Sequence, residues 1–353
     1  MKRREFLQFA ALGAVPLLSP RTPVAGRDEV MTVLGPVAAD RLGRTLMHEH
    51  VMVDFVGADK IRPVRYNPDE VFAEALPRLE ELKAAGCQTL VECTPAFLGR
   101  DPELLRRLAR ASGLHLLTNT GIYGAASDKY VPAFAFRESA RELAARWTRE
   151  AEEGIPPSGI KPGFMKIGVD PGPLSEIDAK LVRGAAMTHQ RTGLVIASHT
   201  GDGTAATAQI ALLESLGVSL SAFIWVHAQN ATDPALHRKA AERGAWVEFD
   251  GIAPATIPKY VKLVMNMKRA GLLERVLISQ DSGWYHVGEP GGGTFRPYTT
   301  LFEHFVPALL EAGADSRDVE TLLVRNPRLA LAQPGFALRQ PRTAPLAGAI
   351  MKD

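Results

Sequence analysis

The stretch Gly43-Arg44-Thr45-Leu46-Met47-His48-Glu49-His50 places two histidines one residue apart, directly after an apolar run. Side chains at positions i and i+2 of a β-strand point to the same face. We therefore expect His48 and His50 to direct two imidazoles toward one point. Neutral imidazole is a common ligand of divalent metals, although a hydrogen-bonded pair in the core would have the same spacing. The motif thus predicts a strand and leaves the metal site as one of two interpretations.

Seven further apolar segments follow this strand, and each is succeeded by a segment with helical periodicity. Strict alternation of strands and helices indicates a parallel sheet with helical crossovers. Eight such units, counted from Thr45, predict an α/β fold of the (β/α)₈ TIM-barrel type. The alternative is an open doubly wound sheet, but no Gly-x-Gly-x-x-Gly motif follows the first strand. The later strands are expected at residues 88–93, 114–119, 163–169, 193–198, 222–226, 245–249 and 275–279.

Short elements flank the expected barrel. Residues 30–47 alternate and turn at Gly35-Pro36, which predicts a β-hairpin leading into the first strand. A C-terminal helix over residues 315–323, followed by Asn326-Pro327, is expected to pack under or beside the barrel. The helices of the eight units are expected at residues 68–85, 101–112, 136–152, 175–192, 204–216, 233–243, 257–270 and 297–312.

The first 25 residues have the pattern of an export signal. A basic head with the pair Arg3-Arg4 precedes an apolar stretch, Phe9 to Leu18, that is too short to cross a bilayer as a mature helix. The twin arginines predict a Tat signal and a periplasmic or otherwise exported protein; an ordinary basic amphipathic N-terminus is the alternative. A single folded domain is then expected over residues 26–332, with residues 333–353 as an extended Pro-rich tail.

The charge of the chain gives no sign of a nucleic acid or membrane partner. The net charge is +2, but four of the 41 basic residues and one of the 39 acidic residues lie in the first 25, which leaves −1 for the rest. Cys87 and Cys93, the only cysteines, are separated by roughly 20 Å of extended chain, beyond disulfide reach. We expect both to be small buried side chains.

Further polar side chains fall where other expected strands end. His199 and His227 follow the fifth and sixth strands, and Asp281 follows the eighth. The C-terminal ends of the strands form the rim that carries the chemistry of (β/α)₈ barrels. One lysine, inside the apolar fourth strand, completes a group that chance hardly explains, and a metal site becomes the favoured interpretation. The expected metal ligands are His48, His50, Lys166, His199, His227 and Asp281.

Lys166 is chemically awkward in such a site. A protonated lysine directed at two dications would be repelled and costly to bury. Reaction of its amine with carbon dioxide would give an anionic carbamate, N6-carboxylysine, whose oxygens can bridge two metals. The alternative is a lysine that reaches solvent or pairs with an acid. The four histidines favour the carbamate.

These residues resemble the phosphotriesterase family of the amidohydrolase superfamily. The resemblance rests on the first-strand motif and the later strand ends, includes the lead-in Val33 to Pro36, and runs from about Val30 to Leu329. It implies a (β/α)₈ barrel with two divalent metal ions, commonly Zn²⁺, and often a homodimer. It also implies that His48, His50 and Asp281 hold the more buried ion, that His199 and His227 hold the more exposed one, and that carboxylated Lys166 and a hydroxide bridge them.

A metal-dependent hydrolase acting on ester bonds is therefore expected, of the phosphotriesterase or phosphotriesterase-like lactonase type. The bridging hydroxide would attack a small-molecule organophosphate triester, ester or lactone. Asp281 would receive its proton, and Lys166 and Tyr123 are the other catalytic candidates. Tyr123 resembles a pocket tyrosine of lactonase members, although simple packing would explain it equally well. The residues expected to bind substrate are Phe97, Tyr123, Trp284, Tyr285, His286 and Phe295.

Two alternatives remain beside this assignment. One is a lactonase or carboxylesterase with only incidental phosphotriesterase activity. The other is a catalytically inactive metal-containing protein that binds a small molecule. Two positions depart from the family pattern: Asn230 stands where many members have acidic residues that relay a proton, and Gly251 stands where lactonase members commonly carry an arginine. Both departures leave the substrate open without altering the metal ligands.

Overall fold

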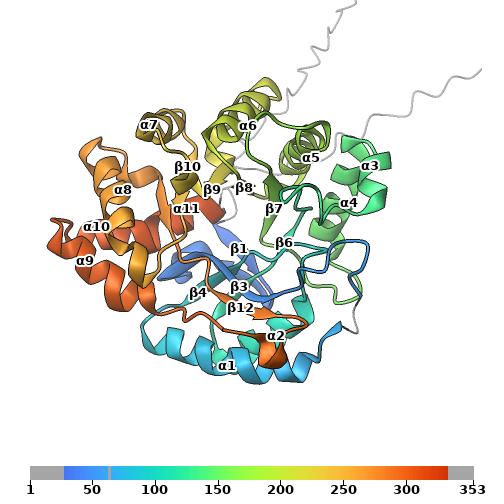
Figure 1. The fold of residues 1–353 in the computed structure, drawn as a ribbon, viewed down its shortest axis with the longest axis horizontal. Coiled ribbons are helices and arrows are strands. Elements are labelled where there is room, and N and C mark those ends of the chain that lie inside the picture. The colour runs from blue at the N-terminus through green and yellow to red at the C-terminus, as the bar shows by residue number, and fades with distance from the viewer. Residues whose placement is uncertain (1–27, 63–64, 333–353) are drawn as a thin grey trace, which may run out of the picture.

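A computed structural model of the protein describes residues 28–62 and 65–332. These residues form a (β/α)₈ barrel, with parallel strands in the centre and helices around them (Figure 1). The expected export signal and C-terminal tail lie outside the described residues. None of the helices in the described part of the chain is a candidate for crossing a membrane, because none is both long and apolar enough.

The barrel strands occur close to the predicted positions, but two are interrupted, and β12 lies beyond the expected eighth strand (residues 275–279) and was not predicted. The third is split into β5 and β6, and the eighth into β11 and β12. Pairing runs β6-β7-β8-β9-β10-β11 on one side and β12-β3-β4-β5 on the other. The bounds are β3 (Thr45–Val53), β4 (Thr89–Glu92), β5 (His115–Leu117), β6 (Asn119–Thr120), β7 (Phe164–Val169), β8 (Ile196–Thr200), β9 (Phe223–Val226), β10 (Trp246–Phe249), β11 (Val276–Ile278) and β12 (Gly283–His286).

The helices pack one apolar face against the strands. In α1, the buried positions Val71, Ala75, Leu79 and Leu82 recur at helical spacing, and the side chain of Asn67 caps the helix by accepting from the Asp69 amide. The helix bounds are α1 (Pro68–Ala84), α2 (Pro102–Ser112), α3 (Ala133–Arg137), α4 (Ala140–Glu153), α5 (Glu176–Thr192), α6 (Gly203–Ser215), α7 (Pro234–Glu242), α8 (Ile257–Arg269), α9 (Val306–Glu311), α10 (Ser316–Glu320) and α11 (Asn326–Ala332).

Three expected helices differ from the structure. The helix expected over 136–152 is two helices, because a capping box at Ser139 starts α4 afresh. The helix expected over 297–312 begins with a π-helical segment at Leu301, whose amide is bound by the side chain of Gln280. The last helix does not end before Asn326-Pro327 but continues through α11, where the Asn326 amide group donates to two carbonyls beside β11.

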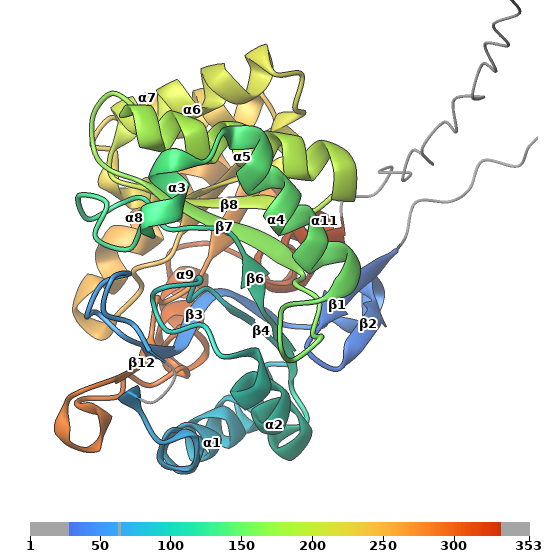
Figure 2. The ribbon, with the colours of Figure 1, turned by 90° about the vertical axis from the view of Figure 1, so that its right-hand side faces the viewer.

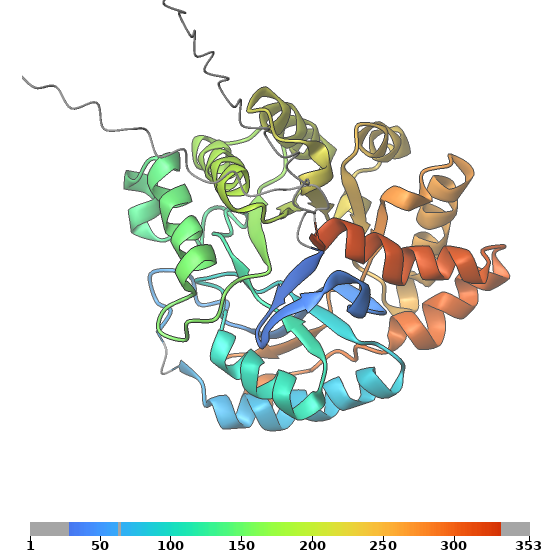
Figure 3. The same cartoon turned by 180° about the vertical axis from the view of Figure 1, so that it is seen from behind.

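The hairpin and the last helix close the N-terminal end of the barrel. Strands β1 (Glu29–Thr32) and β2 (Gly35–Ala38) pair antiparallel, so Val33 and Leu34 form the turn and Gly35-Pro36 begins the second strand. Figure 3 shows this hairpin and α11 lying across the barrel. Figure 2 shows that β12 and the long loops lie at the opposite end. That opposite, C-terminal end is therefore the open rim at which a site can form.

A β-bulge in β3 sets the direction of the two motif histidines. Leu46 pairs with Leu90 but Glu49 pairs with Glu92, so one extra residue stands in β3 between these pairs. Such a bulge redirects the side chains that follow it. His48 and His50 point into the barrel beyond the bulge. Glu49 points the other way and joins β3 to the segment between β11 and β12, accepting from the Gln280 and Ser282 amides at 3.0 Å and 2.6 Å.

Candidate metal centre

The C-terminal rim brings together all six metal-ligand candidates expected from the sequence. They line one cavity of about 160 Å³. Its histidine rings are close neighbours: the ring centroids lie 5.3 Å apart for His48 and His50, 5.0 Å for His48 and His227, and 4.4 Å for His199 and His227. Side chains that were selected on different strands of the expected barrel therefore lie together at one place in the fold.

The first group of ligand atoms consists of two imidazole nitrogens and one carboxylate oxygen. Oδ1 of Asp281 lies 3.1 Å from His50 Nε2 and 3.8 Å from His48 Nε2. The other ring nitrogens are engaged elsewhere, since His48 Nδ1 lies 3.0 Å from Asp250 and His50 Nδ1 lies 2.8 Å from Thr94 Oγ1. The Nε2 atoms are thus free to present lone pairs to a common centre.

The ionisation of this group suits metal binding. Burial lowers the pKa of His48 to about 3, and it also lowers the pKa of His50, so both imidazoles are neutral near pH 7. Burial alone would raise the pKa of Asp281, but its close approach to the His50 ring, together with the neighbouring imidazoles, outweighs burial and brings the pKa to about 2. Among the described residues, the buried Asp281 Oδ1 makes no hydrogen bond. Two neutral nitrogens and an orphaned anionic oxygen fit a divalent cation.

The second group contains His199 and His227. His227 follows β9 in the left-handed conformation, with φ of 61°, and its Nδ1 lies 2.6 Å from Asp250 Oδ1. Burial, followed by the charges of His227 and Lys166, holds the pKa of His199 well below its usual value. The Tyr123 hydroxyl lies 3.1 Å from His199 Nδ1.

Lys166 lines the same cavity as the two groups. It is buried within β7, and its only polar contact among the described residues is His48 Nε2, 3.1 Å from Nζ. It neither reaches solvent nor forms an ion pair with any described carboxylate, which removes the two structural explanations considered from the sequence. Lys166 is therefore a buried lysine without a described carboxylate partner, placed among side chains that can bind a metal.

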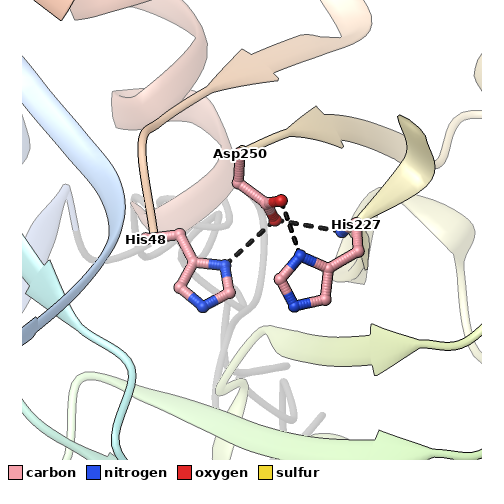
Figure 4. A group of neighbouring side chains, drawn as sticks. All are labelled: His48, His227 and Asp250. Atoms are coloured by element: carbon pink, nitrogen blue, oxygen red, sulfur yellow. Dashed lines mark hydrogen bonds and ion pairs between the residues drawn. The ribbon is translucent and has the colours of Figure 1, made fainter. Parts of the chain in front are cut away.

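Asp250 is the functional residue that sequence reasoning missed. It follows β10 and its carboxylate lies between His48 and His227, with one oxygen bound to each ring (Figure 4). These three residues are close enough to form a metal-binding group of their own, as are His48, His50 and Asp281. The position was detectable, because Asp250 ends the seventh strand as His227 and Asp281 end theirs. However, an aspartate followed by a glycine is equally typical of a turn, which is why Asp250 was not predicted as a site residue.

The structure places only some of the residues expected to bind substrate at the cavity. Tyr123 and Trp284 line the cavity, whereas Tyr285 points away because β12 is a strand and alternate side chains face opposite sides. His286 lies on the same face of β12 as Trp284 but is not among the residues that line the cavity, and its ring lies 5.6 Å from the Phe55 ring. Phe97 packs on Phe134, and Phe295 packs on Tyr298. The wall also contains residues that were not expected: Phe55, Pro95, Leu98, Ala126 and Tyr130.

Comparisons with known proteins agree with the fold and the site. The model of the Phosphotriesterase family matches residues 28–331. The phosphotriesterase homology protein of Escherichia coli K12 is 29% identical over 293 residues, 82% of this chain and 97% of that protein. The aryldialkylphosphatase of Saccharolobus solfataricus is 25% identical, over 87% of this chain and 98% of that protein. A solved structure of an organophosphate hydrolase engineered from a weak promiscuous lactonase template superposes with a TM-score of 0.77 at 29% identity, over 86% and 99% of the two chains.

Proposed function

This chain belongs to the phosphotriesterase family and is a metal-dependent hydrolase, and we propose that it uses two divalent ions, most simply Zn²⁺, to hydrolyse ester bonds. The observation that carries the proposal is the convergence of His48 Nε2, His50 Nε2 and the orphaned Asp281 Oδ1 next to the buried Lys166. Imidazole nitrogen and carboxylate oxygen are the ligands that zinc accepts in catalytic sites.

The assignment of ligands follows from the two groups. His48, His50 and Asp281 would hold one ion, and His199 and His227 would hold the other. Lys166, as a carbamate, would lie between them and add its negative charge to that of Asp281. When bound, the ions would lower the pKa of a coordinated water toward neutrality and polarise the P=O or C=O bond of the substrate.

The protein's own side chains would supply the proton transfer and orientation. Asp281 is ionised at neutral pH and lies at the centre of the site, so its carboxylate is placed to accept a proton from the attacking water. Burial raises the pKa of Tyr123, so its hydroxyl stays protonated and can donate a hydrogen bond to a substrate oxygen. The aromatic wall, including Phe55 and Trp284, would exclude water around the reacting bond.

The shape of the cavity favours a compact, neutral substrate. Its volume is about 160 Å³, and its wall above the ligand atoms is aromatic or apolar. A phosphotriester with three large substituents needs more room than a small lactone or carboxylic ester. We therefore favour the lactone or carboxylic ester as substrate, with phosphotriesters as slower ones. The lactonase pocket is not reproduced throughout, since a Cβ at Gly251 would lie 2.2 Å from the Tyr260 hydroxyl, and the arginine of lactonase members would fit there only if Tyr260 moved.

A hydrolysis screen on the zinc-loaded full chain tests this proposal. The panel should contain a small γ-lactone, an aryl acetate and a diethyl aryl phosphate triester, each with and without a chelator. We expect turnover of the first two to exceed that of the triester, to stop on chelation and to return with added zinc. Triester turnover well above the others would reverse our substrate order. Absence of all three activities from a chain that binds two ions would instead identify a metal-containing binding protein.

A further inference from the structure

Asp250 makes contacts that no other described carboxylate of the site makes. It is completely buried at the end of β10. Its Oδ2 lies 3.0 Å from His48 Nδ1, and its Oδ1 lies 2.6 Å from His227 Nδ1 (Figure 4). His48 comes from the first strand and belongs to one ligand group, whereas His227 follows the sixth strand and belongs to the other. One carboxylate therefore touches one imidazole from each group.

These contacts fix where the two ring protons are. An ionised carboxylate only accepts hydrogen bonds, so each Nδ1 that it binds must carry a hydrogen. A neutral imidazole with hydrogen on Nδ1 has its lone pair on Nε2. In His48, that Nε2 faces Asp281 and Lys166, as a metal ligand should. Asp250 thus selects the tautomer of two ligands at once.

The carboxylate of Asp250 is itself held firmly. Its Oδ2 accepts from the His227 backbone amide at 3.0 Å, and its Oδ1 accepts from Gln229 Nε2 at 2.7 Å. The side-chain oxygen of Gln229 in turn accepts from the Asp250 amide. The bond to the His227 amide also supports the left-handed conformation that turns this ring toward the cavity. Neither oxygen can move toward one histidine without loosening the other.

We infer that Asp250 is a positioning residue that couples the two metal sites, so that ordering His48 around one ion prepares His227 for the other. The inference rests on the proposed two-metal function. Both rings share the Asp250 carboxylate, so binding of the first ion restrains that carboxylate and, through it, the other ring. The second ion then loses less free energy to conformational entropy and binds more tightly than the first. Coupling of this kind is reciprocal, so either ion should promote the binding of its neighbour.

Asp250→Asn is the direct test, with Glu248→Gln as its matched control. Asparagine keeps the shape but offers one acceptor and one donor, so only one of the two rings can keep its Nδ1–H bond. Glu248 is a buried carboxylate on the same strand, and its Oε2 lies 4.0 Å from His48 Nδ1, beyond hydrogen-bond distance. The control therefore removes a neighbouring buried carboxylate without removing a hydrogen bond to a ligand.

Zinc titration in competition with a chromophoric chelator measures the coupling. We expect two ions to bind cooperatively to the wild type and to Glu248→Gln. In Asp250→Asn we expect affinity for at least one ion to fall about 10- to 100-fold and the cooperativity to vanish. Two ions bound to Asp250→Asn with wild-type affinity and cooperativity would overturn the inference and leave the proposed function intact. A wild type that binds one ion or none would refute both.

A second measurement takes its decisive result from the wild type, so it does not depend on whether Asp250→Asn folds. Long-range ¹H–¹⁵N NMR spectra of metal-free, histidine-labelled wild type report which ring nitrogen carries the hydrogen. We expect the Nδ1–H tautomer for both His48 and His227, assigned with His48→Asn and His227→Asn. In Asp250→Asn, one of the two should lose this preference. An Nε2–H tautomer at either ring in the wild type would overturn the inference directly.

Discussion

Lys166 is buried within β7 with a single polar neighbour, His48 Nε2, among the described residues. A carbamate on this lysine would place two oxygens and a negative charge between the ions. Lys166→Ala removes that bridge and leaves a gap that protein atoms cannot readily fill. We expect the variant to bind metal poorly and to lose hydrolase activity. Metal content by elemental analysis and turnover of the best substrate are the measurements.

Chemical rescue separates the bridge from ordinary packing. A small carboxylic acid added to Lys166→Ala can enter the gap and bridge the ions, so activity should return in part. A matching amine should not restore it. Lys161→Ala, at an exposed position just before β7, is the control and should behave as wild type. Full metal content and wild-type turnover in Lys166→Ala would show that the lysine has only a structural role.

The buried imidazole of His48 predicts how acid affects the metal-free protein. Burial, followed by the charge of Lys166, lowers the pKa of His48 from 6.5 to about 3 in the folded chain. The unfolded chain therefore takes up a proton at higher pH than the folded chain does. The contribution of His48 to stability is full above pH 6.5 and is lost as the pH falls from 6.5 toward 3.

Urea denaturation in the presence of a chelator, repeated across that pH range, measures this effect. We expect the free energy of unfolding of the wild type to fall steadily as the pH decreases from 6.5. His48→Asn removes the titrating ring and should show a shallower fall over the same range. An identical slope in the two proteins would mean that His48 titrates in the folded chain as it does in the unfolded one.

At the scale of elements, the loop between β6 and α3 shapes the substrate cavity. Ala126, Ser127 and Asp128 have φ values of 63°, 55° and 61°, a left-handed run that is unfavourable for residues other than glycine. The Ser127 amide donates to the Asp170 carboxylate at 3.0 Å. This bond holds the turn that carries Ala126 and Tyr130 to the cavity wall.

Asp170→Ala should therefore alter substrate binding more than chemistry. Losing a hydrogen bond to a charged group weakens the turn by about 1.5 kcal/mol, which corresponds to roughly a tenfold rise in KM. We expect metal content and kcat to change little. Asp170→Asn keeps an acceptor for the Ser127 amide and should stay near wild type. Loss of metal in Asp170→Ala, or an unchanged KM, would contradict this role for the loop.

The strands could be predicted because each repeats one simple pattern, an apolar run followed by a helical segment. The same regularity located His199, His227 and Asp281, since strand ends meet at one rim. The residues of the cavity wall were harder to predict, because the backbone path of a loop is not specified by any short sequence pattern. Trp284 and Tyr285 seemed alike in the sequence, and only the pairing of β12 with β3 separates them. The left-handed turn that begins at Ala126 could not be predicted, because none of its residues with positive φ is a glycine.

At the scale of the whole molecule, we propose that residues 1–25 direct export of the folded, metal-loaded chain through the twin-arginine route, which carries folded proteins. Arg3→Lys together with Arg4→Lys should leave an unprocessed precursor in the cytoplasm. Fractionation of cells and immunoblotting of each fraction are the measurements. The two lysines keep the positive charge of the arginines, so a loss of export in this double variant could not be explained by a change of charge. Unchanged delivery of the double variant would refute the proposed localisation.

The barrel places all of its expected ligands at one end, because its parallel strands have their C-terminal ends there, and the hairpin and α11 close the other end (Figures 2 and 3). The central claim is that this end holds two ions. Elemental analysis of the wild-type chain, purified without chelator and equilibrated with zinc, tests it most directly. We predict two ions per chain, with Lys166 carboxylated in a crystal structure of that protein. A reproducible value of one ion or none, with Lys166 unmodified, would contradict it.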